Sequence, residues 1–244
     1  MSSATPKTDL TVPAGAASCA VLASGGVESS VLVAELSRAY RRVYPIYVRE
    51  GLVWEAVEQR RLRQFLEAIG GDRAPAKGEG TGAAIAPLIE LWLPVNDVYQ
   101  GHWSVSGQGT PDAHSPDEAM YLPGRNLLLL SKAALWCHLN GVGALALGTL
   151  GTNPFPDSTP EFYRDFEAVF NRAVGGELCV LRPFLQLTKA EVIRRGRELP
   201  LGLTFSCVSP VGGEHCGRCN KCEERRRGFE AAGVVDPTVY AAAR

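Results

Sequence analysis

The sequence of 244 residues lacks any apolar run of the roughly 18–20 residues that a membrane-spanning helix needs. Its first stretch, MSSATPKTDLTVPAGAAS, also lacks the hydrophobic segment of a secretory signal peptide. We therefore interpret residues 1–17 as a flexible leader, and we expect a cytoplasmic protein with no membrane partner.

An excess of charge of either sign is missing as well, because 25 basic and 26 acidic residues leave a formal net charge of −1. A protein that coats DNA or RNA needs an extended positive surface. No nucleic-acid partner is therefore expected, although a local basic pocket is compatible with this balance. Only four histidines are present, at positions 102, 114, 138 and 215, and they form no recognisable Ser-His-Asp constellation.

What the chain does contain is an alternation of short apolar runs with amphipathic stretches. Its length suits one large domain, or one domain with a small appendage. The alternation predicts an α/β fold, a doubly wound and mostly parallel sheet with helices on both faces. The strands are expected at residues 19–24, 43–48 and 144–150, and the helices at 29–40, 54–69 and 126–139. We expect residues 18–200 to form this main domain.

The polar segment 96–120 shows little periodicity and is long for a passive connection. Two interpretations stay open for it, a lid or binding loop and a disordered surface insertion.

Residues 24–30, SGGVESS, follow the first expected strand and lead into a helix. Two glycines let the backbone approach an anion closely, and the N–H groups of the turn and the helix start attract negative charge. No Lys-Ser/Thr pair follows and no G-x-G-x-x-G is present, so this is neither a Walker A loop nor a dinucleotide fingerprint. A plain strand-to-helix turn explains the same residues. The candidate phosphate contacts are Ser24, Gly25, Gly26, Val27, Ser29 and Ser30.

Four of the seven cysteines are clustered as C-x8-C-x2-C-x2-C near the C-terminal end, at Cys207, Cys216, Cys219 and Cys222. Two-residue spacing lets neighbouring thiolates turn toward one ion, and four thiolates suit tetrahedral Zn²⁺. A C-x-x-C redox pair is the alternative, but no thioredoxin pattern surrounds it. We expect a structural zinc site in a small subdomain, residues 201–244, packed on the main domain.

The residues around this cluster have simpler interpretations. Nearby cations, Arg218, Lys221 and residues 225–227, would offset the thiolate charge, and His215 is interpreted as a solvated loop histidine rather than a substitute ligand. The remaining cysteines lie in apolar contexts and are expected to be buried free thiols. They are Cys19, Cys137 and Cys179.

The segment 24–30 resembles the pyrophosphate-binding loop S-G-G-x-D-S of the PP-loop ATP pyrophosphatase superfamily. The resemblance implies an adenine nucleotide alpha hydrolase-like fold that cleaves ATP, with Mg²⁺, to activate an oxygen as an adenylate. Glu28 stands where the superfamily has Asp. Its longer side chain displaces the carboxylate by about one C–C bond, which matters where positioning is tight.

The loop and the cysteine cluster together resemble the 7-cyano-7-deazaguanine synthase family. Residues 122–126, LPGRN, are similar to the family's V-P-G-R-N, and residues 156–162, PDSTPEF, to its Y-P-D-C…E-F segment. Residues 187–191, LTKAE, are similar to its lysine-bearing helix start. The resemblance runs from about residue 18 to residue 240.

This resemblance implies an ATP-dependent C–N ligase that joins ammonia to a small-molecule carboxylate, as in the conversion of 7-carboxy-7-deazaguanine to the nitrile precursor of queuosine. Members are often dimeric, which makes a homodimer an expectation. The candidate catalytic residues are Glu28, Arg125 and Lys189, and the candidate substrate contacts are Arg125, Asn126 and Asp157.

Each candidate has a plainer reading. Arg125 could form a surface ion pair and Asp157 a turn, while Thr188 and Glu191 match a helix capping box. Lys189, in the first turn of that helix, opposes the helix dipole, which favours a contact with phosphate.

The second strand departs from the family, because D-Y-G-Q-[RK]-H is replaced within residues 47–55, YVREGLVWE. This departure indicates a diverged branch and leaves three alternatives open. They are a paralogue that acts on another carboxylate (a small molecule or a protein terminus) or stops at the amide, a tRNA-modifying PP-loop enzyme, and a non-enzymatic zinc module that binds nucleic acid through Arg225–Arg227.

Overall fold

The computed structural model describes residues 17–70 and 84–241. Residues 1–16 of the expected leader, and most of the Gly- and Ala-rich stretch before residue 87, lie outside the described residues. Within the described part, six parallel strands form one sheet in the order β3-β2-β1-β5-β6, with β4 also pairing with β2. The strands are β1 (Ser18–Leu22), β2 (Arg42–Arg49), β3 (Ala84–Ile85), β4 (Ile89–Trp92), β5 (Ala144–Ala146) and β6 (Cys179–Leu181).

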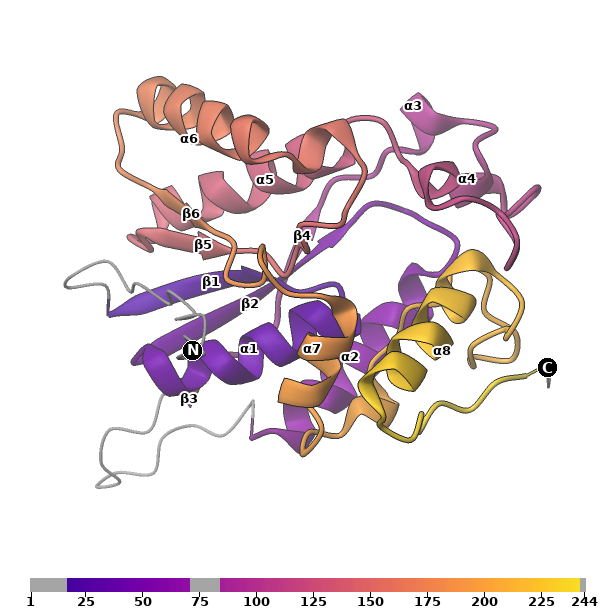
Figure 1. The fold of residues 1–244 in the computed structure, drawn as a ribbon. Helices are drawn as coiled ribbons and strands as arrows, with labels where there is room; N and C mark the ends of the chain where they lie inside the picture. The colour runs from indigo at the N-terminus through magenta and orange to yellow at the C-terminus, as the bar shows by residue number, and fades with distance from the viewer. Residues whose placement is uncertain (1–16, 71–83, 242–244) are drawn as a thin grey trace, which may run out of the picture.

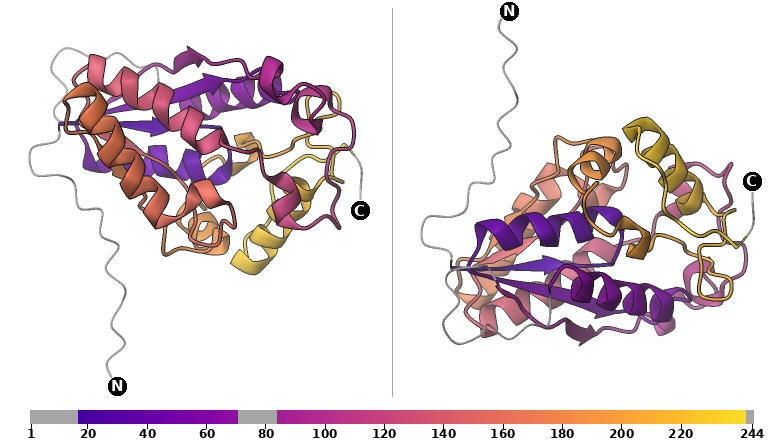
Figure 2. Two further views of the ribbon diagram at one scale, coloured as in Figure 1. Left: turned by 90° about the horizontal axis from the view of Figure 1, so that it is seen from above. Right: turned by 90° about the horizontal axis from the view of Figure 1, so that it is seen from below.

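Helices cover both faces of the sheet, so the predicted doubly wound α/β fold is confirmed (Figure 1). One face packs against α1 (Val27–Ala39), α2 (Glu55–Ala68) and α7 (Lys189–Arg195), and the other against α5 (Arg125–Leu139) and α6 (Pro160–Val174). Figure 2 shows the two layers from above and from below. Helix α8 (Asn220–Ala232) packs against α7 and extends the first layer beyond the end of the sheet.

The central strands are apolar because both of their faces are buried. Cys19, Ala20 and Val21 of β1 are fully buried, and successive side chains enter the two hydrophobic clusters on opposite sides of the sheet. Cys19 and Val21 pack with α1, whereas Ala20 packs with the apolar residues of α5. This double burial explains the continuous apolar run that predicted the strand.

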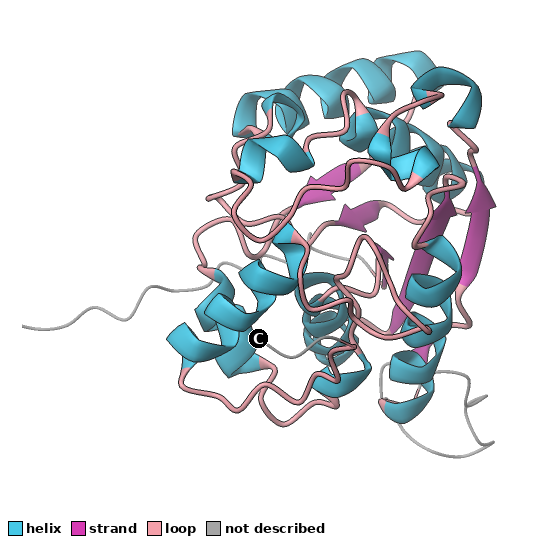
Figure 3. Ribbon diagram, turned by 90° about the vertical axis from the view of Figure 1, so that its right-hand side faces the viewer, coloured by secondary structure: helices cyan, strands magenta, loops and turns pink. Residues whose placement is uncertain are grey.

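The direction of winding reverses between β1 and β5. The chain passes from β1 outward to β2, β3 and β4, and later strands are added on the other side of β1. In open α/β sheets, ligands bind at such a switch point, beyond the carboxyl ends of the strands. Figure 3 looks toward this side of the molecule, where several loops and the C-terminal segment converge.

Segment 96–120 is ordered, so the disordered-insertion alternative is wrong. It contains α3 (Asn96–Tyr99), α4 (Trp103–Ser106) and the 3₁₀ turn η1 (Asp117–Met120). It packs against the cysteine-bearing segment, because the Asn220 side chain donates to the Ser115 carbonyl at 2.9 Å and Asp112 forms a β-bridge with Cys219. The order of this segment could not be predicted from its polar sequence, because much of its packing uses backbone groups rather than an apolar stripe.

Other boundaries differ from the sequence-based expectations. The expected strand 144–150 ends at Ala146, and the chain then passes close to the start of α1, where a Cβ on Gly148 would lie 3.0 Å from the backbone of Glu28 and Ser29. Helix α6 and strand β6 were not predicted. The 3₁₀ turns η2 (Pro156–Ser158) and η3 (Leu201–Leu203) complete the described elements. Over the described residues, no helix combines the length and the apolar character that would let it cross a membrane.

Candidate functional site

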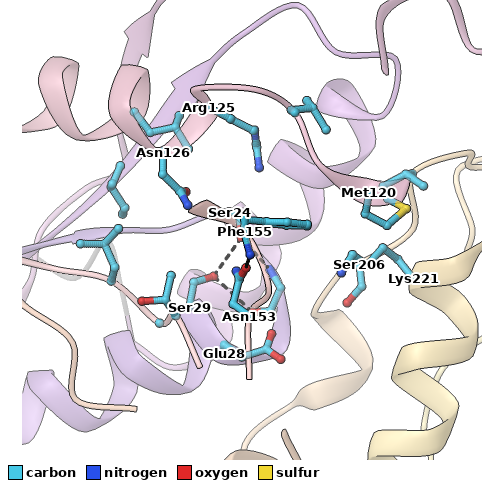
Figure 4. A pocket seen from close by; sticks show the side chains of 18 of the residues that line it. Ser24, Glu28, Ser29, Met120, Arg125, Asn126, Asn153, Phe155, Ser206 and Lys221 are labelled. Carbon is cyan, nitrogen blue, oxygen red and sulfur yellow. Dashed lines mark hydrogen bonds between the residues drawn. The ribbon is translucent and has the colours of Figure 1, made fainter. Parts of the chain in front are cut away.

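A cavity of about 380 Å³ opens at the switch point. Its wall combines the residues after β1 and β2, the start of α5, the loop after β5, and residues from α7, α8 and the segment before the cysteines. A volume of this size is within the range of small-molecule sites. In Figure 4, Ser206 and Lys221 lie on the far side of the cavity from Ser24 and Glu28.

The glycine turn forms one end of the cavity. Gly25 has a φ of +83°, and a Cβ on it would lie 3.2 Å from Leu62 Cβ and 3.3 Å from the Glu58 carbonyl oxygen. This position therefore requires glycine on both conformational and packing grounds. Behind it, the Phe205 N–H donates to the Gly25 carbonyl at 2.7 Å, which ties the turn to the C-terminal part of the chain.

Half of the predicted phosphate contacts face the cavity. Ser24, Gly26 and Ser29 line it, and the two serine hydroxyls lie 3.3 Å apart (Figure 4). Gly25, Val27 and Ser30 support the turn from behind, and the Ser30 hydroxyl is buried without a hydrogen-bond partner in the described structure. Helix α1 begins at Val27 with no side-chain cap, so its first N–H groups are available to an anion.

Two lysines and two carboxylates form a network beside the turn. Lys189 Nζ lies 2.9 Å from Glu28 Oε1 and 2.8 Å from Glu224 Oε1, and Lys221 Nζ lies 2.6 Å from Glu224 Oε2. Burial alone would lower the pKa of Lys189, but the two carboxylates outweigh it and raise this pKa above the ordinary lysine value. Burial would raise the pKa of Glu224, and the lysines instead hold it well below the usual range. All four side chains line the cavity, and sequence reasoning missed Glu224 and the position of Lys221.

The helix that begins with Lys189 has the predicted capping box. Thr188 accepts from the Glu191 N–H, and the Glu191 carboxylate accepts from the Thr188 N–H at 2.7 Å. The capping box fixes the first turn of α7, and with it the backbone of Lys189 from which the side chain extends.

Arg125 is engaged by a carboxylate of its own chain. Its Nη2 lies 2.6 Å from Glu50 Oε2, and its Nε lies about equally far from both Glu50 oxygens, at 3.1 and 3.0 Å. The Glu50 side chain is only 2% exposed and that of Arg125 30%, so this is a partly buried ion pair rather than the surface pair considered above. Both residues line the cavity, and Glu50 follows β2 in the segment that departs from the family pattern.

Asn126 and Asp157 hold each other. The Asp157 carboxylate accepts from the Asn126 backbone N–H at 2.9 Å and from its side-chain amide at 3.3 Å. Because the residue before α5 is Gly124, which has no side chain to cap the helix, Asp157 caps the start of α5 from outside. Both residues line the cavity.

Part of the cavity wall is aromatic and acidic, and the sequence pattern did not reveal it. Trp54 and Trp103 stack with their ring centroids 5.7 Å apart, and Tyr121 lies 5.2 Å from Phe155. Nearby, the Tyr47 hydroxyl donates to Glu58 Oε2 at 2.7 Å. These side chains all border the cavity. Only the packing of 96–120 brings Trp103 to Trp54, so no local signal could have placed them together.

The four clustered cysteines converge as predicted. Their Sγ atoms all lie within 4.8 Å of one another, and all four residues are buried. Backbone N–H groups point at the sulfurs, with Cys216 N 3.2 Å from Cys207 Sγ and Cys219 N 3.3 Å from Cys216 Sγ. Such donors stabilise thiolates, so this cluster could hold a metal ion.

Two expectations about the surrounding cysteines and histidine are wrong, and the nucleic-acid alternative loses one of its three arginines. His215 is buried rather than solvated, because its ring packs on Phe205 and its Nε2 accepts from the Ser206 N–H at 3.2 Å. Burial followed by the charge of Arg225 lowers the pKa of His215 to about 3. Arg225 is 0% exposed and donates to Thr204, Thr238 and the Leu201 carbonyl, so it offers nothing to nucleic acid. Cys179 is half-buried, whereas Cys19 and Cys137 are buried thiols as expected.

These features define a class. The chain is a doubly wound α/β protein with a glycine turn and a cavity at the switch point of the sheet, and with a cysteine cluster in its C-terminal part. A family model described as queuosine biosynthesis protein QueC matches residues 18–233, and the chain belongs to that family.

Several curated relatives are described as 7-cyano-7-deazaguanine synthase. The protein from Methanothrix thermoacetophila is 31% identical over 228 residues, covering 90% of this chain and 96% of that protein. The protein from Syntrophotalea carbinolica is 32% identical over 235 residues, covering 91% and 95%. The protein from Solidesulfovibrio magneticus is 42% identical over 131 residues, covering 49% and 56%.

Proposed function

We propose that this protein is an ATP-dependent C–N ligase of queuosine precursor biosynthesis that converts 7-carboxy-7-deazaguanine and ammonia into 7-cyano-7-deazaguanine. The observation that supports this most is the meeting of the glycine turn and the Lys189–Glu28–Glu224–Lys221 network in one cavity with an aromatic wall. The turn and its lysines suit a polyphosphate and the aromatic side chains a flat ring, and the relatives are described as 7-cyano-7-deazaguanine synthases.

In this proposal the phosphates of ATP lie against the turn at residues 24–30. The free N–H groups at the start of α1 and the hydroxyls of Ser24 and Ser29 would donate to them, while Lys189 and Lys221 would supply positive charge. Mg²⁺ bound with the nucleotide would neutralise phosphate charge, and Glu28 is the carboxylate placed to help hold it.

The reaction follows from this placement. A carboxylate oxygen of the acid attacks the α-phosphorus of ATP, pyrophosphate leaves, and an acyl adenylate forms. Ammonia adds to the acyl carbon, loses a proton and displaces AMP to give the amide. A second ATP activates the amide oxygen in the same way, and loss of AMP and of the remaining amide protons gives the nitrile. Positioning and charge stabilisation supply the catalysis, so no Ser-His-Asp nucleophile is required.

We assign zinc to the four cysteines, because four converging thiolates are the ligand set of structural Zn²⁺ sites. With every tetrahedral position filled by protein, the ion would be structural and would stabilise the segment that carries Lys221 and Glu224. The use of ATP as a substrate is consistent with a cytoplasmic location, and light scattering will show whether the protein is a homodimer.

One observation favours a second candidate, a paralogue that acts on a different carboxylate or stops at the amide. Arg125, the cation expected to bind a substrate anion, is already paired with Glu50. Because Glu50 belongs to the diverged segment after β2, this pair could alter which acceptor fits the cavity.

The decisive experiment incubates the zinc-loaded protein with Mg²⁺-ATP, ammonium and 7-carboxy-7-deazaguanine, and follows the products by mass spectrometry. The proposal expects the nitrile, with two AMP formed per nitrile, and no product from the Lys189→Met variant. Amide without nitrile would support the second candidate. No AMP and no amide, in protein that still binds ATP, would disprove the acid as substrate, and ATP–pyrophosphate exchange with other carboxylic acids would then test the paralogue.

A further inference from the structure

Four glutamates line the cavity, and Glu58 differs from the other three in its partners. Glu28 and Glu224 are paired with lysines, and Glu50 is paired with Arg125. Glu58 forms no ion pair within the described residues, although it is 9% exposed and lines the cavity. Its one hydrogen-bonding partner in the described structure is the hydroxyl of Tyr47.

The neighbouring acid shows why Glu58 is left without a cation. One helical turn earlier, Glu55 takes both nearby donors, Arg49 Nε at 2.9 Å and the Gly51 N–H at 2.7 Å. Arg125, the remaining nearby cation, is held by Glu50. The nearby cations are therefore paired with Glu55 and Glu50, and Glu58 lines the cavity without one.

The two oxygens of Glu58 are not equivalent. Oε2 accepts from Tyr47 at 2.7 Å. Oε1 has no protein partner within the described residues, and it is not among their buried unpartnered atoms, so it is open to the cavity. The Glu58 backbone also abuts the glycine turn, since its carbonyl oxygen would lie 3.3 Å from a Cβ on Gly25. The backbone of Glu58 therefore lies against the glycine turn, while its carboxyl lies against Tyr47 and lines the cavity.

The surroundings favour the protonated form of Glu58. Burial raises its pKa to about 8, Glu50 and Glu55 add to this, and Arg125 and Tyr47 oppose it. These four groups come from β2 and the segment after it, from α2 and from α5, and they are the groups that act on Glu58. A protonated carboxyl can donate a hydrogen bond, which none of the paired acids can do.

We propose that Glu58 recognises the ring of the substrate, with its Oε1–H donating to a ring oxo group while Tyr47 holds Oε2. The ligand class is a flat heterocycle that presents a carbonyl oxygen and lies against the aromatic wall that contains the stacked Trp54 and Trp103. The inference rests on the proposed function for the identity of the ring. Glu58 thereby determines which ring is bound, because an amino group in place of the oxo group places a second hydrogen-bond donor opposite the Glu58 O–H.

The test measures ligand binding without ATP, so it is independent of turnover. Quenching of tryptophan fluorescence, with Trp54 and Trp103 in the cavity wall, reports the Kd of 7-carboxy-7-deazaguanine between pH 6.5 and 9. A group with a pKa of about 8 keeps its proton in about nine-tenths of molecules at pH 7 and about one-tenth at pH 9, so affinity should fall about tenfold. The analogue with an amino group in place of the ring oxo group should bind at least about tenfold more weakly at pH 7.

Two variants separate this role from a structural one. Glu58→Gln keeps a donor that does not titrate, so its Kd should stay flat from pH 7 to 9. Tyr47→Phe removes a hydrogen bond that favours the ionised form, so the loss of affinity should move to higher pH. Near-ultraviolet circular dichroism and thermal melting check that both variants are folded.

Three results would overturn the inference. They are a wild-type Kd that does not change with pH, tighter binding at high pH, and a dependence of Kd on pH in Glu58→Gln that is identical to wild type. Binding of the acid that weakens with pH as expected, without formation of amide or nitrile, would overturn the proposed function alone. Failure of the acid to bind at any pH would overturn both, and turnover together with a flat binding profile would overturn only the role of Glu58.

Discussion

The Phe205 N–H donates to the carbonyl oxygen of Gly25 at 2.7 Å, so a residue two positions before the first clustered cysteine fixes the first glycine of the anion turn. Phe205 is itself fully buried against His215. The cysteine cluster and the turn are therefore mechanically connected.

Metal removal should consequently weaken nucleotide binding as well as stability. We expect a chelated protein, or the Cys219→Ser variant, to melt at a lower temperature and to lose at least about tenfold in ATP affinity, because the segment that holds Gly25 loosens. Calorimetry and equilibrium binding measure both. Cys137→Ser, at a buried thiol remote from the cluster, is the matched control and should leave ATP affinity unchanged. Normal ATP affinity in metal-free protein would contradict the connection.

Glu224→Gln should separate charge from position at the network. The substitution removes a carboxylate shared by Lys189 and Lys221, so the lysines keep their charge but lose their fixed geometry. We expect kcat to fall about 10–100-fold with a smaller change in the KM for ATP, because a misplaced group costs rate more than binding. Glu198→Gln, which breaks an exposed pair with Arg197, should change neither parameter. Equal losses in both variants would argue against a positioning role.

Gly25→Ala should be more damaging than an alanine at another left-handed glycine. Gly175 has a φ of +63° with nothing within 4 Å of an added Cβ, so Gly175→Ala should cost about 1 kcal/mol from backbone strain alone. At Gly25 the Cβ also meets Leu62 and the Glu58 carbonyl, so we expect about 2 kcal/mol or more and loss of ATP binding. Urea unfolding and ATP titration compare the two. Similar losses of unfolding free energy and of ATP binding in the two variants would show that Leu62 and Glu58 do not restrict a side chain at position 25.

Glu50→Gln should lower the free energy of unfolding by about 3 kcal/mol, because it leaves the Arg125 guanidinium without its buried counter-charge. The measurement is urea denaturation at pH 7, with Glu198→Gln as the exposed control. If Arg125 is instead satisfied by water from the cavity, the loss will be below about 1 kcal/mol.

The pH dependence of stability offers a further check on Glu58. Its folded pKa, about 8, lies above its ordinary value of 4.5, so the native state holds a proton that the unfolded state releases. This group therefore contributes a loss of stability as pH rises from about 4.5 to about 8. In Glu58→Gln that contribution is absent, and the fall in unfolding free energy over this range should be smaller than in wild type. Identical slopes would contradict a protonated Glu58.

Periodicity and motif spacing predicted β1, β2 and β5, the glycine turn and the cysteine cluster, because each depends on residues close in the chain. The partners of the motif residues could not be predicted. Glu224 reaches Lys189 from a helix whose sequence indicates only charge, and Arg225 alone of the three consecutive arginines 225–227 is fully buried. The pairing of Arg125 with Glu50 joins positions 75 residues apart and depends on how β2 and α5 meet. These relationships arise from tertiary packing, for which a single sequence has no local signal.

The order in which the parts of the cavity appear in the chain has a consequence for biosynthesis. The glycine turn leaves the ribosome before Phe205, Lys221 and Glu224 do. A nascent chain can form β1 and its turn but has neither the hydrogen bond that fixes Gly25 nor the carboxylate that orders the lysines. The cavity is thereby completed only after the cysteine-bearing segment has been made and has docked.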